Sequence, residues 1–211
     1  HLSIRRQRQM CIRDSPYRID TMLLMKSSDY PQLSDIITTF QQWDRKGDSS
    51  SRGAAIFLLV YEHVKKMMEG QDERALTMTE CVDTYTAVYQ HMMKYFGRTN
   101  LVLGDIQKLV RGAAAYPLWG LPDLLSPQWT DPFANGQRKA VGGDGLIMFT
   151  RFPKNGLPYI ETVNMYGASA RPDSKHFNDQ INLYRFQQTK RMTLDKDEVY
   201  RNAKRIYHPG E

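Results

Sequence analysis

An uninterrupted apolar stretch in the first half of the sequence most restricts how this chain can fold. Residues 54–60 read Ala-Ala-Ile-Phe-Leu-Leu-Val, and Val64, Met67 and Met68 follow at helical spacing. The pattern predicts a helix over Gly53–Glu69 that is apolar all round at first and amphipathic later. Such a helix must be buried on most sides. The longest apolar run, Ala54–Tyr61, is far shorter than the roughly 18–20 residues that span a bilayer, so we predict a core helix and no membrane partner.

Two further helices are predicted on either side of this one. Ser34 is a plausible N-cap for a helix, and a polar loop over Asp44–Arg52 follows it. Thr77 and Glu80 form a capping box, in which each side chain satisfies an orphan amide of the first turn, and Gly97 suits the left-handed residue after a helix. The core-facing residues predicted for the two helices are Ile36, Ile37, Phe40 and Trp43 for the first and Val82, Tyr85, Val88, Tyr89, Met92 and Phe96 for the second.

The pattern changes to strand and turn signals after Gly97. Residues 101–110 and 116–119 look extended, residues 122–136 look like a loop, and Gly145–Phe152 is an apolar run bounded by turn residues. Pro153–Gly156 is turn chemistry, and residues 159–165 form the returning strand. We therefore predict a hairpin whose first strand is buried on both faces, because it shows little alternation.

The end of the sequence predicts two helices. Asn178 or Asp179 caps the first, which runs to Gln188. Asp195 and Glu198 form a capping box for the second, which ends at Pro209 and Gly210. This second helix is expected to bury the side chains of Val199, Ala203, Ile206 and Tyr207. One α+β unit over residues 16–211 accounts for these elements.

The net charge of +6 is concentrated in the first fifteen residues, which hold four of the 29 basic and one of the 23 acidic residues. The remainder carries +3, which weakens a nucleic-acid interpretation, and we expect no nucleic-acid partner. Gln9–Ser15 (QMCIRDS) resembles one reading frame of a transposon-end sequencing adapter. We interpret residues 1–15 as a translation artefact, with a disordered basic tail as the alternative.

Sequence motifs for cofactors and metals are missing. The two cysteines, Cys11 and Cys81, are far apart and neither lies in a C-x-x-C pair, so a disulfide framework or thiolate metal site is not predicted. The histidines at 63, 91, 176 and 208 show no ligand spacing. The glycine-rich residues 142–145 precede a strand rather than a helix, so they predict a turn rather than a phosphate site. We expect no cofactor and no metal.

Ser169, Asp173 and His176 suggest a hydrolase triad, but the pattern fails. Arg171 occupies the position where the nucleophile elbow G-x-S-x-G requires its second glycine. A triad also needs groups that converge from separate elements, whereas these three share one loop and are better explained as holding that loop together. The chain begins at His1 and so is not expected to present an N-terminal nucleophile itself.

Four motifs in the second half of the sequence carry a family resemblance. They are DIQKLVRG (105–112), YPLWGLPD (116–123), GGDGLIMFTRF (142–152) and ETVNMYGASARPDSKHFNDQ (161–180). In this order they resemble the C-terminal region of the penicillin acylase family, most closely its acyl-homoserine-lactone-acylase-like branch. SPYRID (15–20) and FGRTNLVLGD (96–105) extend the likeness, which covers about Pro16 to Pro209.

The resemblance implies the C-terminal portion of an αββα sandwich, the fold of N-terminal-nucleophile hydrolases. In such enzymes a precursor cleaves itself and exposes a Ser at the start of the β-subunit, whose free amine acts as general base. The Ser attacks an amide carbonyl, and water releases the acyl-enzyme. The implied substrate is a small N-acylated molecule, an acyl-homoserine lactone or a penicillin-like amide. The alternative is a non-catalytic relative with a structural or interaction role.

The family's nucleophile, its neighbouring His and the oxyanion Asn lie upstream of the matching region, so the resemblance implies that this chain alone is inactive. Its implied partners are the remainder of the β-subunit and the α-subunit of the same precursor. The implied location is periplasmic or secreted, with any export signal outside this chain. We also expect the isolated chain to be marginally stable, because its apolar helix and buried strand should pack on elements it lacks.

Site residues are carried over from the resemblance one at a time. Glu161 is a candidate for orienting the upstream His, and its alternative is an ordinary solvated strand residue. The remaining polar residues are expected to support the loop: Asp144, Ser169, His176, Asp179 and Gln180. Lys175 occupies a position where the family prefers Pro. This difference makes the resemblance slightly weaker, but it affects no residue with a known chemical role.

Overall fold

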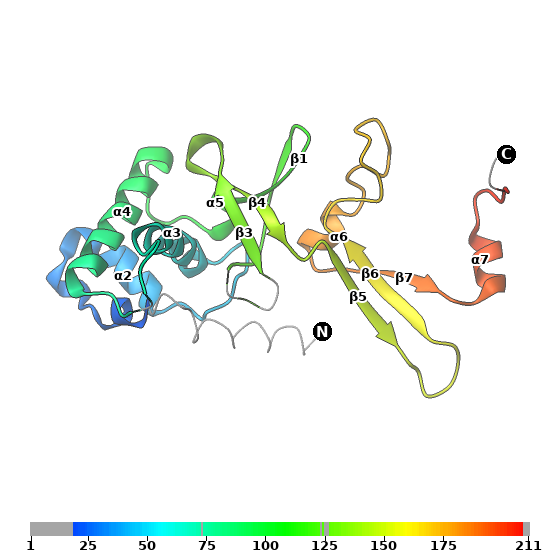
Figure 1. The fold of residues 1–211 in the computed structure, drawn as a ribbon, viewed down its shortest axis with the longest axis horizontal. Coiled ribbons are helices and arrows are strands. Elements are labelled where there is room, and N and C mark those ends of the chain that lie inside the picture. The colour runs from blue at the N-terminus through cyan, green and yellow to red at the C-terminus, as the bar shows by residue number, and fades with distance from the viewer. Residues whose placement is uncertain (1–18, 73, 123, 125–126, 209–211) are drawn as a thin grey trace. The chain divides into compact units, whose positions relative to one another are not determined.

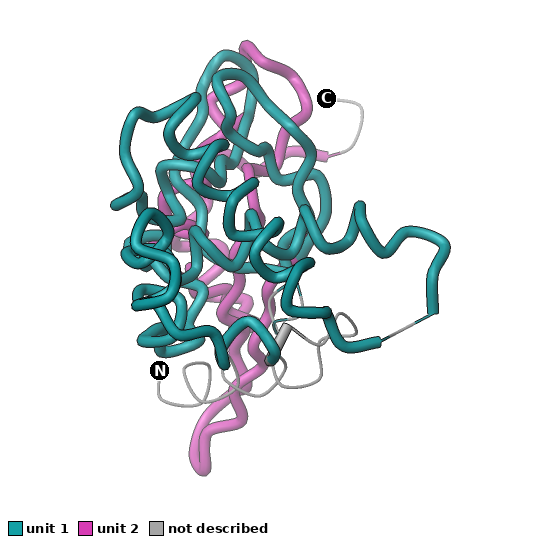
Figure 2. Tube along the Cα trace, turned by 90° about the vertical axis from the view of Figure 1, so that its left-hand side faces the viewer, with its two compact units in different colours: residues 1–143 teal, residues 144–211 magenta. Residues whose placement is uncertain are grey.

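The computed structural model describes residues 19–72, 74–122, 124 and 127–208. The interpretation of residues 1–15 as an artefact or tail lies outside this range. The chain divides into two compact units, residues 1–143 and residues 144–211 (Figure 2), a division that the sequence did not predict. Both contain helices and strands, which confirms the predicted α+β class (Figure 1).

The first unit is built around the predicted apolar helix. Helix α3 spans Arg52–Met67, and its residues 53–61 are all buried. It packs against α2 (Ser34–Gln41) and α4 (Met78–Phe96). The other helical elements among the described residues of the unit are short: η2 (Ile19–Leu24), η3 (Ser27–Asp29), η4 (Pro31–Leu33), α5 (Leu103–Ile106) and η5 (Ala134–Gly136).

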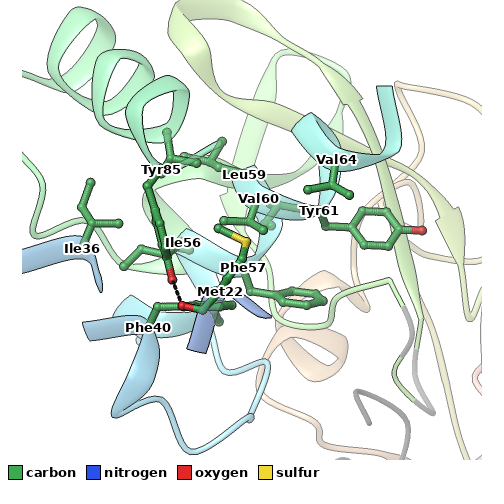
Figure 3. Close-up of a cluster of buried hydrophobic side chains, with 14 of the residues drawn as sticks. Met22, Ile36, Phe40, Ile56, Phe57, Leu59, Val60, Tyr61, Val64 and Tyr85 are labelled. Atoms are coloured by element: carbon green, nitrogen blue, oxygen red, sulfur yellow. Dashed lines mark hydrogen bonds between the residues drawn. The ribbon is translucent and has the colours of Figure 1, made fainter. Parts of the chain in front are cut away.

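Side chains from α2, α3 and α4 meet in one cluster (Figure 3). The Tyr85 hydroxyl donates a hydrogen bond of 3.2 Å to the Met22 carbonyl, which satisfies the polar atom of a fully buried ring. Trp43 lies against Phe57, with ring centroids 5.1 Å apart. The cluster thus takes up nearly all the apolar surface of α3 within the unit.

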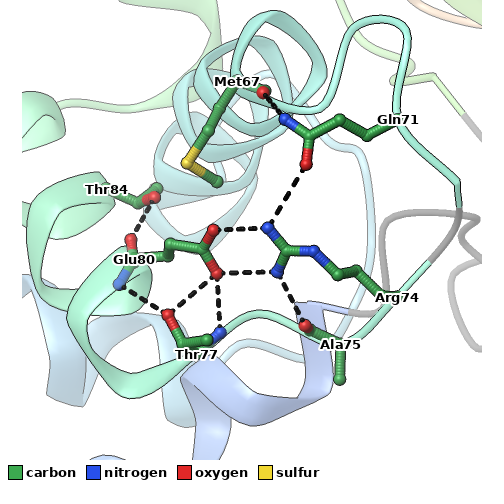
Figure 4. Close-up of polar contacts among 7 residues, drawn as sticks. All are labelled: Met67, Gln71, Arg74, Ala75, Thr77, Glu80 and Thr84. Atoms are coloured by element: carbon green, nitrogen blue, oxygen red, sulfur yellow. Dashed lines mark hydrogen bonds and ion pairs between the residues drawn. The ribbon is translucent and has the colours of Figure 1, made fainter.

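Both ends of α4 have the capping residues that the sequence predicts, whereas the start of α2 does not. The Thr77–Glu80 capping box is present, and Arg74 adds two contacts of 2.9 and 2.6 Å to the Glu80 carboxylate (Figure 4). Gly97 ends α4 with φ +67°, as predicted. The predicted N-cap at Ser34 is wrong, because the 3-10 turn η4 runs into α2 and makes Leu33 the capping position without a side-chain hydrogen bond.

The four-stranded sheet of the first unit has the order β2-β1-β4-β3. Its strands are β1 (Gln107–Arg111), β2 (Ala114–Pro117), β3 (Gln128–Pro132) and β4 (Arg138–Gly143). β3 lies inside the segment predicted as a loop, and α5 replaces part of an expected extended stretch. The inward side chains of β3 are Gln128 and Thr130, so this strand carries no apolar alternation that the sequence could reveal.

The second unit contains an antiparallel sheet of order β5-β6-β7. Its elements are β5 (Leu146–Arg151), β6 (Tyr159–Asn164), α6 (Ile181–Arg185), β7 (Lys190–Thr193) and α7 (Lys196–Asn202). The predicted hairpin is confirmed, with Ile147 opposite Val163. Burial of β5 on both faces is wrong: Leu146 and Met148 point to the same face and are 57% and 56% exposed.

The two terminal helices are shorter than predicted. α6 begins after Gln180 without a side-chain cap and stops before Gln187, which has φ +56°. Asp195 caps α7 by accepting from two amides, but the helix ends at Asn202. Side chains expected inside are exposed, both Val199 within the helix and Tyr207 beyond its end. Within the described ranges, no helix is long and apolar enough to cross a membrane.

Candidate functional site

The six candidate residues all lie in the second unit. Glu161 is on β6, and Ser169, His176, Asp179 and Gln180 belong to the segment that joins β6 to α6. Asp144 is half-buried just before β5. The glycines beside it do not form a free turn, because Gly142 and Gly143 belong to β4 and pair with β3.

Glu161 lies between two arginines on the sheet. Arg151 on β5 donates from Nε to the Glu161 carboxylate at 2.7 Å, and this bond raises the pKa of Arg151 above its usual value. Arg191 is directly opposite on β7, and its guanidinium stacks over the Tyr159 ring at 4.5 Å. The carboxylate is therefore half-buried and ion-paired rather than freely solvated.

Gln180 closes the base of the segment from Tyr166 to Gln180. Its backbone N–H donates to the Tyr166 carbonyl at 2.9 Å, and its side-chain oxygen, Oε1, accepts from the backbone N–H of Asn164 at 3.0 Å. The residue is 3% exposed, and its Nε2 has no hydrogen-bond partner among the described residues. An unsatisfied buried donor is costly, which marks this amide as a place where a further acceptor would be stabilising.

His176 and Asp179 form a pair above this base. The imidazole Nδ1 lies 2.7 Å from a carboxylate oxygen of Asp179, within hydrogen-bond distance. The Ser169 amide donates to the His176 carbonyl at 3.1 Å. Gly167 makes this closure possible, because a Cβ there would lie 2.2 Å from the same carbonyl oxygen.

The arrangement differs from a catalytic triad. The partner of His176 is Asp179, whereas Asp173 pairs with Arg171 at 2.8 Å near the tip of the loop. The Ser169 hydroxyl accepts from the Arg171 amide at 3.1 Å, as in a turn. In the structure these residues hydrogen-bond to one another within the loop, and the bond to Asp179 sets the direction of the His176 imidazole.

A second polar cluster lies in the first unit, where sequence reasoning saw scattered histidines. Glu62 and His63 of α3 line the same pocket as His91 of α4 and Arg138 of β4. Burial raises the pKa of Glu62 and lowers that of both histidines, while Arg138 pairs with Glu62 at 2.8 Å. The proximity arises from helix packing, which spacing along the sequence does not report. No group of three or more potential metal ligands occurs in the described residues.

A comparison with protein families identifies a family whose sequence model this chain matches. The sequence model described as penicillin amidase matches residues 14–201, which is most of the chain and includes both the helical unit and the loop that holds His176. The α+β elements are compatible with a portion of the N-terminal-nucleophile hydrolase fold. Membership implies a hydrolase that acts on amide bonds. The chain belongs to the penicillin amidase family.

Proposed function

We propose that this chain contributes to an enzyme that hydrolyses the amide bond of a small N-acylated substrate, an acyl-homoserine lactone or a penicillin-like amide. The nucleophile in this proposal is an N-terminal Ser that precedes the region described here, with its own amine as general base. Oxyanion donors outside this chain stabilise the tetrahedral intermediate. The family match over residues 14–201 is the observation that carries the proposal.

The experiment is to recover the coding sequence that precedes this region and express both together. N-terminal sequencing of the processed subunits should give a Ser that follows a Gly in the coding sequence. Hydrolysis is measured as the release of the carboxylic acid from N-acyl-homoserine lactones and from penicillin G. Substitution of that Ser by Ala is expected to abolish turnover. Absence of the Ser, together with no turnover of either substrate class, would favour the alternative of a non-catalytic relative.

One face of the second unit supports a partner within the same precursor. Leu146 and Met148 share a face of the sheet with Ile160 and Met192 through the register of β5, β6 and β7. Leu146, Met148 and Met192 remain about half exposed. We propose that the remainder of the β-subunit, or the α-subunit, covers this face, and that the chain alone is inactive. Hydrogen exchange of β5 should slow in the assembled protein.

We further propose that Glu161 orients a histidine of the preceding segment and that Arg151 holds Glu161 in place. In the assembled enzyme, Glu161→Gln should lower kcat by about tenfold or more with little change in KM, as expected when an orienting carboxylate is removed. Asp173→Asn is the matched control, because that carboxylate lies exposed near the loop tip. Equal effects of both substitutions would contradict the role.

The family resemblance also leads us to propose that the intact protein is periplasmic or secreted. Fractionation of cells that express the full coding sequence would test this. Recovery of activity only from the cytoplasmic fraction would contradict the proposal.

A further inference from the structure

A run of exposed side chains follows the last strand of the second unit. Every side chain from Val199 to His208 is exposed, and we call these ten residues the 199–208 segment. It carries three cations, Arg201, Lys204 and Arg205, and no acidic residue. Exposed apolar and aromatic side chains alternate with them, and Ile206 is 66% exposed. Only residues up to 201 belong to the family match, so most of the segment lies beyond it.

One cation of the segment, Arg205, lies beside an aromatic ring, and Lys196, which precedes the segment, lies beside the ring of Tyr200. The guanidinium of Arg205 lies 5.1 Å from the Tyr207 ring centroid, and the Lys196 ammonium lies 5.8 Å from that of Tyr200. Such contacts partly order the long side chains before any partner binds. Tyr and Arg are also the residue types that contribute most when protein interfaces form.

We propose that the 199–208 segment docks onto a protein surface in which carboxylates surround an apolar strip. The carboxylates would pair with Arg201, Lys204 and Arg205, and the strip would cover Tyr200, Ile206 and Tyr207. Charge complementarity selects an acidic partner, and it disfavours a second copy of this chain, because residues 16–211 carry a net charge of +3.

A membrane surface fits the segment less well. Interfacial helices present a continuous apolar face along their length, whereas α7 ends at Asn202 and two of the exposed apolar side chains come after it. Recognition of anionic lipid usually takes clusters of about four to eight basic residues. A vesicle is therefore a competing outcome in the test, as is a single-stranded oligonucleotide.

The test uses the full chain and a synthetic acidic amphipathic helix built from Glu, Leu and Ala, with the same peptide carrying Gln for Glu as control. Binding is followed by shifts of the backbone amide signals of residues 199–208. The triple variant R201Q/K204Q/R205Q should weaken binding at least fivefold. A matched triple variant of exposed cations in the same unit, K154Q/R171Q/K175Q, should change it less than twofold.

A second variant separates the apolar contribution from the charge. Y200A/Y207A keeps all cations, and it should also weaken binding at least threefold. The proposal is overturned if the acidic peptide does not saturate the chain, or if the two triple variants weaken binding equally. It is also overturned if phosphatidylserine vesicles or an oligothymidylate bind the segment more tightly than the peptide does.

Discussion

Gly53 offers a sharp test of how α3 is packed, because two physical effects on this residue have opposite signs. Replacing Gly by Ala in a helix interior normally stabilises by about 0.5–1 kcal/mol. Gly53 lies at the start of α3, where its ideal Cβ would be 2.2 Å from Cγ of Trp43 and 2.3 Å from its Cβ. Real Cβ atoms do not approach so closely, so the ring or the helix must move.

The Trp43 ring has little freedom to move away. Its Nε1 donates to the Lys46 carbonyl at 3.0 Å, and the ring lies against Phe40 and Phe57 with centroid distances of 5.9 and 5.1 Å. Forcing an extra methyl group into a packed site costs about 1–3 kcal/mol. After the helix-propensity gain of about 0.5–1 kcal/mol is subtracted, Gly53→Ala should destabilise the first unit by about 0–2.5 kcal/mol.

Urea unfolding followed by far-UV circular dichroism measures this change, since the two longest helices of the described residues, α3 and α4, both belong to the first unit. The same substitution in a Trp43→Gly background should be neutral or stabilising, because the Cβ and Cγ atoms of residue 43 that cause the clash are then absent. Gly145→Ala is the control, as a Cβ there meets no atom within 4 Å. A gain in stability from Gly53→Ala alone, or an equal loss in both backgrounds, would refute the packing argument.

Three other residues give direct tests. Burial raises the pKa of Cys81 to about 11, so in a Cys11→Ser variant its thiol should react with a disulfide reagent only after urea unfolding. Hydrogen bonds from Arg74 and Thr77 lower the pKa of Glu80 from 4.5 to about 2. The stability it contributes is full above pH 4.5 and falls away toward pH 2, and Glu80→Gln should flatten that part of the pH profile. Gly167→Ala should speed amide exchange at Ser169, because its Cβ would overlap the His176 carbonyl, while exchange in α3 stays unchanged.

Features fixed by neighbouring residues could be predicted from the sequence. The capping box of α4, the glycine that ends it and the β5–β6 hairpin depend on contacts within a few positions. The strand β3 could not be predicted, because its inward residues are polar and its partner β4 supplies the pairing. Burial of β5 failed for a related reason: an apolar run reports a potential for burial, not which face is covered.

In the candidate site, too, the sequence predicted what neighbouring residues determine but not the contacts that depend on the folded geometry. The sequence placed Ser169 and His176 in one loop and Asp179 and Gln180 at the start of the helix after it. Only loop geometry decides that His176 takes Asp179 rather than Asp173 as its partner. The pairing of Glu161 with Arg151 depends on the register between strands that are separated by a turn.

The expectation of marginal stability can now be assigned to one unit. The apolar surface of α3 is buried inside the first unit, so this unit should unfold cooperatively without a partner. The second unit instead leaves Leu146, Met148 and Met192 half exposed. Together they leave roughly 200 Å² of apolar surface uncovered, which forfeits about 5 kcal/mol of burial.

Hydrogen exchange of the isolated chain should therefore show strong protection in α3 and weak protection in β5 and β6 under the same conditions. Substituting Met148 by Thr, which suits an exposed strand position, should leave the isolated second unit as stable as before or more so. The same change should weaken its association with the preceding part of the precursor. Equal protection of α3 and β5 in the isolated chain would show that the second unit needs no cover, and the argument for a partner on this face would fail.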